Sequence, residues 1–171
     1  RELHLARRMR RSQRRSGWRI AADTAFAAVL DHCADAPRPG QDGTWITPAM
    51  RRAYLQLYAA GHAHSVEVWD GDGCLAGGIY GVRIGAMFFG ESMFSAQSGG
   101  SKAALAALCH AMDAAGMPLL DCQVASPHLQ GLGARCIGRD GFQREIAGLV
   151  DRPLDASWPR GFLPHAAAAL G

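Results

Sequence analysis

The feature that most constrains the fold is a run of three closely spaced strand patterns between residues 65 and 90. The first two, residues 65–69 and 75–82, flank the turn sequence DGDG at 70–73, and residues 86–90 supply the third. An Asp-Gly turn between strand-forming segments is typical of a β-hairpin. The pattern therefore predicts a three-stranded meander, which other elements must cover on its apolar side.

Helical patterns lie on both sides of this meander. Thr47 is placed to cap a helix that has Pro48 at its first position and Gly61 just after its end. Asp23 is placed to cap an earlier helix. After a Gly/Ser-rich loop at 95–100, an Ala/Leu-rich segment beginning at Ser101 predicts a third helix.

The remaining chain predicts a buried strand over 118–124 and a last helix from Asp140 to Val150. The resulting order of helices, meander, helix, strand and helix suits an α/β (α+β) fold of the GCN5-related N-acetyltransferase type. Such a fold has a mixed sheet flanked by helices. At 171 residues, we expect one domain over 1–171.

Charge is concentrated at the N-terminus. Residues 1–19 hold eight arginines against one glutamate, a charge of +7, while the remaining chain carries −4. A helical wheel predicts an amphipathic basic helix at about 4–16, with five arginines on one face. We expect this face to bind the phosphates of a nucleic acid. Its residues are Arg7, Arg8, Arg11, Arg14 and Arg15.

Composition also narrows the setting in which the protein works. The five cysteines are scattered and include no C-x-x-C pair, which disfavours a disulfide framework and a zinc site. No stretch has the roughly 18 apolar residues of a membrane span. We therefore expect a cytoplasmic protein with reduced thiols and no membrane partner. The chain begins at Arg1, so a fragment or processed product is expected.

Four segments, matched in order and spacing, resemble the leucyl/phenylalanyl-tRNA–protein transferase family. They are Gly43–Thr47, Gly61–Trp69, Gly90–Ser95 and Leu120–Val124. The basic N-terminal helix and Ser101-Lys102 also stand where the family has them. One departure is that the family carries an additional N-terminal domain, and this chain starts where that domain ends. Part of the donor pocket wall would then be absent.

The resemblance implies an aminoacyltransferase. Such an enzyme takes Leu, Phe or Met from aminoacyl-tRNA and attaches it to the N-terminal Arg or Lys of acceptor proteins, which then enter N-terminal degradation. Because the donor is an ester and the product an amide, we expect no cofactor and no metal. The partners are aminoacyl-tRNA and the acceptor proteins, and a monomer is expected.

The resemblance places Asp121 and Gln123 at the reaction centre. Lying two apart on a predicted strand, they would share one face while Cys122 points to the other. An Asp beside a Gln amide can be oriented to receive a proton from the attacking amine. Glu91, expected just past a strand, would hold the acceptor's cationic amine or Arg side chain.

The resemblance also implies a pocket for the aminoacyl side chain. Its six residues are Trp45, Tyr54, Met93, Leu105, Leu108 and Met112. The last three recur at helical spacing, which alone indicates only a core. His62 and His64 lie two apart, and we expect them to have structural or hydrogen-bonding roles rather than to bind zinc.

Two alternatives remain open. An acetyl-CoA-dependent N-acetyltransferase could use the sequence QSGGS at 97–101 to cradle a pyrophosphate at a helix N-terminus. Acetyl-CoA chemistry leaves the arginine helix unexplained, however. The other alternative is a catalytically inactive tRNA-binding module, although the motifs for chemistry are all present.

Overall fold

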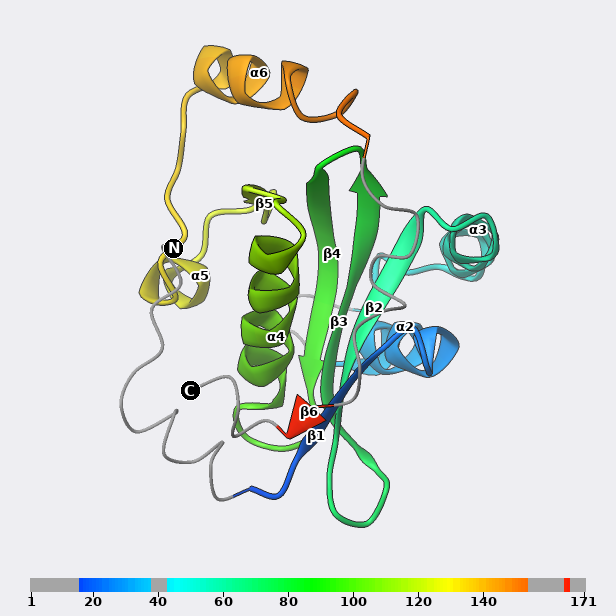
Figure 1. Cartoon of the computed structure of the whole chain (residues 1–171). Coiled ribbons are helices and arrows are strands. Elements are labelled where there is room, and N and C mark those ends of the chain that lie inside the picture. The colour runs from blue at the N-terminus through cyan, green and yellow to red at the C-terminus, as the bar shows by residue number, and fades with distance from the viewer. Residues whose placement is uncertain (1–15, 38–42, 154–164, 167–171) are drawn as a thin grey trace.

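The computed structural model describes residues 16–37, 43–153 and 165–166. A six-stranded sheet runs through the molecule in the order β5-β4-β3-β2-β1-β6 (Figure 1). Of the described strand pairs, only β4 and β5 are parallel, so the sheet is mixed. Its strands are β1 Arg19–Ala22, β2 Ala63–Trp69, β3 Leu75–Ile84, β4 Met87–Ser95, β5 Leu119–Asp121 and β6 His165–Ala166.

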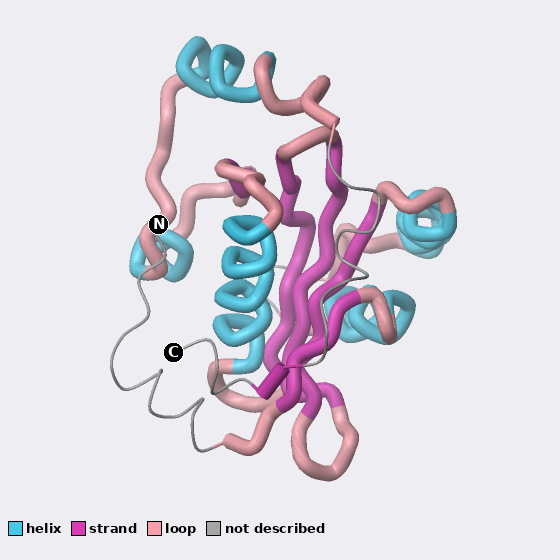
Figure 2. Tube along the Cα trace, in the orientation of Figure 1, coloured by secondary structure: helices cyan, strands magenta, loops and turns pink. Residues whose placement is uncertain are grey.

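Helices cover both faces of the sheet, as Figure 2 shows. The helix α4 packs on one face, and α2 and α3 lie on the other. Two short helices, α5 and α6, follow β5. The bounds are α2 Phe26–Asp35, α3 Pro48–Ala59, α4 Gly100–Ala114, α5 Pro127–Gly131 and α6 Arg139–Ala147. The predicted mixed sheet flanked by helices is therefore confirmed.

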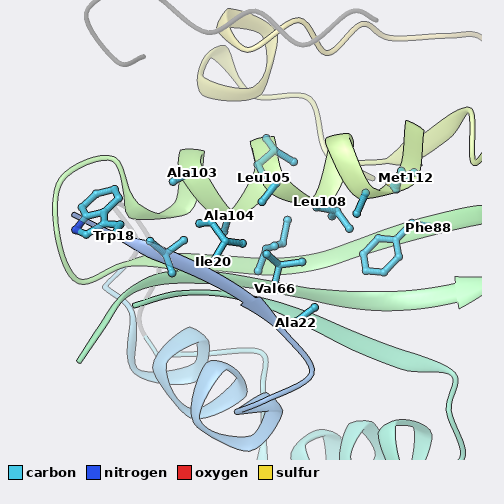
Figure 3. Packing of buried hydrophobic residues seen from close by; sticks show 14 of the residues in the cluster. Trp18, Ile20, Ala22, Val66, Phe88, Ala103, Ala104, Leu105, Leu108 and Met112 are labelled. Carbon is cyan, nitrogen blue, oxygen red and sulfur yellow. The ribbon is translucent and has the colours of Figure 1, made fainter. Parts of the chain in front are cut away.

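The core on the α4 side joins α4 to the central strands (Figure 3). Leu105 and Leu108 of α4 are 4% and 1% exposed and pack with Ile20, Val66 and Phe88 of the sheet. Small residues let the helix lie close to the strands. A Cβ atom at Gly100 would stand 2.1 Å from the carbonyl oxygen of Ala76. Only glycine fits at this contact between α4 and β3.

The core on the other face contains Phe26, Leu30, Tyr54, Tyr80 and Phe94. The Tyr80 ring packs edge to face with Phe26 and with Tyr54, whose centroid lies 5.1 Å from that of Tyr80. The helix α3 starts as the sequence predicts, because the Thr47 hydroxyl accepts a hydrogen bond from the backbone N–H of Met50 and Pro48 follows it. These contacts fix α3, and with it Tyr54, against the sheet.

The predicted cap at Asp23 is wrong. The helix α2 begins after Ala25 without a side-chain cap, and Asp23 has a left-handed backbone with φ 56°. Its carboxylate instead accepts hydrogen bonds from the Ser65 backbone N–H and the His64 ring nitrogen Nδ1, each at 2.8 Å. This tertiary contact ties the end of β1 to β2.

Candidate active site

A β-bulge in β4 places Glu91. In the pairing of β3 with β4, Tyr80 faces Ser92 and Gly81 faces Gly90, so Glu91 is the extra residue. The consequence is visible in the core. Phe88 and Phe94 are six residues apart and would share a face in a regular strand, yet they pack on opposite faces of this sheet. The predicted position of Glu91, just past the end of a strand, is therefore wrong. Glu91 lies inside β4, at the bulge.

The bulge directs the Glu91 carboxylate toward α3. The Tyr54 hydroxyl donates a hydrogen bond of 2.8 Å to Glu91 Oε2. Burial, reinforced by this hydrogen bond and the charge of Glu91, raises the pKa of Tyr54, so the hydroxyl stays protonated. Among the described residues, no other group forms a hydrogen bond or ion pair with the Glu91 side chain. Within the described part of the chain, this half-buried carboxylate thus has one neutral donor and no cationic partner.

The strand β5 ends at Asp121. The prediction that Asp121 and Gln123 share one face of a strand is therefore wrong. Gln123 lies beyond the strand with a left-handed backbone, φ 60°. Its backbone N–H donates to Asp121 Oδ1 at 2.7 Å, and its side-chain Nε2 donates to the Gly90 carbonyl oxygen at 3.1 Å. A non-glycine residue in this conformation is strained, and such strain is concentrated at functional sites.

These contacts make the chain segments of the three predicted polar residues neighbours, although the Glu91 carboxylate is bonded to Tyr54 of α3. Asp121 pairs with Phe89 at the end of the parallel β4–β5 ladder, and Gln123 reaches across to Gly90, the neighbour of Glu91. Asp121 and Gln123 both line a cavity of about 1140 Å³ beside α4. The site is therefore built where β4 bulges and β5 stops.

The six residues of the predicted aminoacyl pocket lie in two groups. Leu105, Leu108 and Met112 belong to the α4-side core, with Met93 packed against it, and Leu105 and Met112 also line the cavity. Tyr54 belongs to the core on the opposite face, and the Trp45 ring lies 6.2 Å from it, centroid to centroid. Trp45 is 41% exposed. The structure thus brings four of the six together and separates Tyr54 and Trp45 from them.

The loop before α4 is poorly suited to a pyrophosphate. The backbone N–H of Gly100 donates to Gln97 O at 2.9 Å, and that of Ser101 donates to Ser95 Oγ at 2.8 Å. The Gln97 side chain also binds the carboxylate of Asp70 at 2.6 Å, which puts negative charge beside the loop. Donors that a phosphate would need are engaged, which disfavours the acetyl-CoA alternative.

The thiol of Cys122 is a poor nucleophile at neutral pH. Burial, and secondarily the charge of Asp121, raises its pKa, while burial raises that of the nearby Cys109 to about 11. His64 is buried against Asp23, and His62 precedes β2 and is exposed. No group of three or more metal-ligating side chains occurs among the residues that the structure describes. The predicted basic helix at about 4–16, with Arg7, Arg8, Arg11, Arg14 and Arg15, lies outside the described residues.

Comparison with known proteins gives the class of this protein. A family model described as "Leucyl/phenylalanyl-tRNA protein transferase" matches residues 1–147. A transferase of that name from Xanthomonas axonopodis pv. citri (strain 306) is 55% identical over 99% of this chain and 68% of its own length. One from Xylella fastidiosa (strain M12) is 55% identical over 91% of this chain and 64% of its own length.

The protein is accordingly an enzyme of the aminoacyltransferase class. It belongs to the leucyl/phenylalanyl-tRNA–protein transferase family. The chain spans about two thirds of the length of these relatives. Among solved structures, a ribosomal-protein-alanine N-acetyltransferase from Brucella melitensis biovar Abortus 2308 matches 71% of this chain and 94% of its own, at 16% identity and a TM-score of 0.46. No described helix has the length and apolar character needed to cross a membrane.

Proposed function

We propose that this chain transfers Leu, Phe or Met from aminoacyl-tRNA to the N-terminal Arg or Lys of acceptor proteins in the cytoplasm, which marks them for N-terminal degradation. The observation that carries the proposal is that the Gln123 side chain, whose backbone is bonded to Asp121, reaches the carbonyl oxygen of Gly90, the residue before Glu91. A carboxylate with no cationic partner among the described residues suits the acceptor's cation, and we assign the second carboxylate, Asp121, to the transfer step.

The chemistry asks for little beyond orientation and one proton acceptor. The acceptor's α-amine attacks the ester carbonyl of the aminoacyl-tRNA, the amide bond forms, and the tRNA leaves with its terminal hydroxyl. With a reference pKa near 8, roughly a tenth of the amine is already neutral at pH 7. Asp121 Oδ2, which has no hydrogen-bond partner among the described residues, is available to take the proton that the amine loses.

The donor side would use the apolar residues beside α4. Leu105 and Met112 supply an apolar wall of the cavity beside α4, and Leu108 and Met93 pack in the core on the same face of the sheet. Such a surface would accept Leu, Met and Phe together, because one methylene more or less changes binding by only about 1 to 3 kcal/mol. The tRNA itself would be held by the arginines of residues 7–15 through its phosphates, with little reading of base sequence. We propose that the enzyme acts as a monomer without a cofactor.

The acceptor half of this proposal is tested with a peptide panel. Peptides that differ only in their first residue, Arg, Lys, Gln or Glu, are offered with leucyl-tRNA. We expect the Arg and Lys peptides to be extended at least tenfold faster than the Gln peptide, because an ionic hydrogen bond to Glu91 is stronger than a neutral one. The Glu peptide should react slowest. Equal rates for the Arg and Gln peptides would contradict a carboxylate that selects cations.

A further inference from the structure

The Glu91 side chain has an unusual position for a group that must bind a ligand precisely. As the extra residue of a bulge, it has no partner directly opposite it on β3. A glutamate has three rotatable side-chain bonds, and fixing such a side chain costs on the order of 1.5–2 kcal/mol in lost rotamer freedom. Something other than the strand ladder must therefore hold the carboxylate if it is to be preorganised.

Tyr54 is the described residue that can do so. Its hydroxyl forms the 2.8 Å hydrogen bond to Glu91 Oε2, and its ring is 7% exposed, packed edge to face against Tyr80 and Trp45. The backbone beneath the ring is fixed as well, because α3 begins at a capped turn and packs on the sheet. A phenol ring held on several sides presents its hydroxyl at one point, so the donor is rigid although the acceptor is not.

The two oxygens of the Glu91 carboxylate have different surroundings. Oε2 receives the Tyr54 hydroxyl, whereas Oε1 has no hydrogen-bond or ion-pair partner among the described residues. The raised pKa of Tyr54 keeps its proton in place, so the hydroxyl donates to the carboxylate and does not compete with it for a cation. One oxygen is thus committed to the protein and the other is left for a ligand.

We propose that Tyr54 is a positioning residue for the acceptor. It fixes the Glu91 carboxylate so that Oε1 receives the cationic side chain of the acceptor's N-terminal residue. This inference rests on the proposed function and names the group that orients its acceptor site. It moves Tyr54 from the donor side, where the sequence resemblance put it, to the acceptor side. The reason is that Tyr54 packs on the sheet face opposite Leu105, Leu108 and Met112.

The test is Tyr54→Phe, which removes the hydroxyl and keeps the ring. We expect KM for an Arg-starting peptide to rise roughly tenfold, the loss expected for one hydrogen bond to a charged group. The value of kcat and the ratio of leucyl to phenylalanyl transfer should change by less than twofold. The matched control is Tyr58→Phe on the same helix, whose hydroxyl donates at 2.9 Å to a backbone oxygen, that of Asp23, rather than to Glu91. It should leave acceptor KM unchanged.

A double-mutant cycle shows whether Tyr54 acts through Glu91. If it does, the double variant should have a KM less than twofold higher than that of Glu91→Gln alone, because the charge that Tyr54 orients is already gone. An unchanged KM in Tyr54→Phe, an equal rise in Tyr58→Phe, or effects that multiply fully in the double variant would each overturn the assignment.

Calorimetry without tRNA gives the peptide's dissociation constant. This measurement tests the role of Tyr54 independently of the proposed transfer reaction. Tenfold weaker binding in Tyr54→Phe alone would support the assignment even if the wild-type protein transferred nothing, in which case the proposed reaction would fail by itself. Active transfer with identical peptide affinity in wild type and Tyr54→Phe would reject the assignment and leave the reaction standing.

Discussion

Asp121→Asn should lower kcat by roughly 100-fold or more while the affinity for charged tRNA holds, because general-base catalysis contributes about 10² to 10⁴. The substitution keeps the shape of the side chain. Its amide oxygen can still accept the hydrogen bond that Asp121 Oδ1 receives from the Gln123 backbone. What is lost is the negative charge and the capacity to take a proton. The measurement is single-turnover transfer from phenylalanyl-tRNA to an Arg-starting peptide across pH 6 to 9.

Asp113→Asn is the control, since Asp113 lies on α4 and lines the same cavity. It should change kcat by less than threefold. If raising the pH restored Asp121→Asn to the wild-type rate, the amine would lose its proton to solvent and Asp121 would only orient it. Normal rates of Asp121→Asn at every pH would show that Asp121 has only a structural role, which is to hold the turn at Gln123.

The second large effect is expected for Glu91→Gln, which should raise KM for an Arg-starting peptide by roughly 10- to 100-fold. The amide keeps the size of the side chain and can still accept the Tyr54 hydroxyl, so folding should be unaffected. The charge that attracts the acceptor's cation disappears. Glu145→Gln, an exposed change on α6, removes the same charge away from the bulge and serves as the control.

These two glutamate variants are compared through initial rates at varied peptide and fixed leucyl-tRNA, together with the affinity for tRNA. A fall in tRNA affinity with unchanged peptide KM in Glu91→Gln would place this carboxylate on the donor side. An equal rise in both variants would mean only that the net charge of the protein attracts a basic peptide.

Much of the fold follows from local sequence patterns. The DGDG turn and its flanking strands predict the hairpin that became β2 and β3, and Thr47-Pro48 predict the start of α3. The strand β1 was missed because four residues give too short a pattern, and the five residues of α5 were missed for the same reason. Asp23 resembles a helix cap in sequence, but its partners, Ser65 and His64, are about forty residues away.

The candidate site residues could be named from the sequence, but their geometry could not. The motifs around Gly90 and Asp121 single out Glu91, Asp121 and Gln123, which the structure brings together. The bulge was not foreseen, because one extra residue shows only in the pairing of β4 with β3. Sequence spacing also could not assign Tyr54 to a face of the sheet, because the face that α3 covers is set by tertiary packing. The left-handed turn at Gln123 likewise depends on β5 ending at Asp121, two residues earlier than Gln123.

The identity of the donor tests the proposed reaction most directly. The protein is incubated with an Arg-starting peptide and, in parallel, with leucyl-tRNA, uncharged tRNA plus free leucine, or acetyl-CoA, and the peptide is analysed by mass spectrometry. We expect one added leucine, located at the N-terminus by fragmentation, with leucyl-tRNA alone and no change with the other two mixtures. An acetylated peptide with acetyl-CoA and no leucine addition from leucyl-tRNA would contradict the proposed reaction.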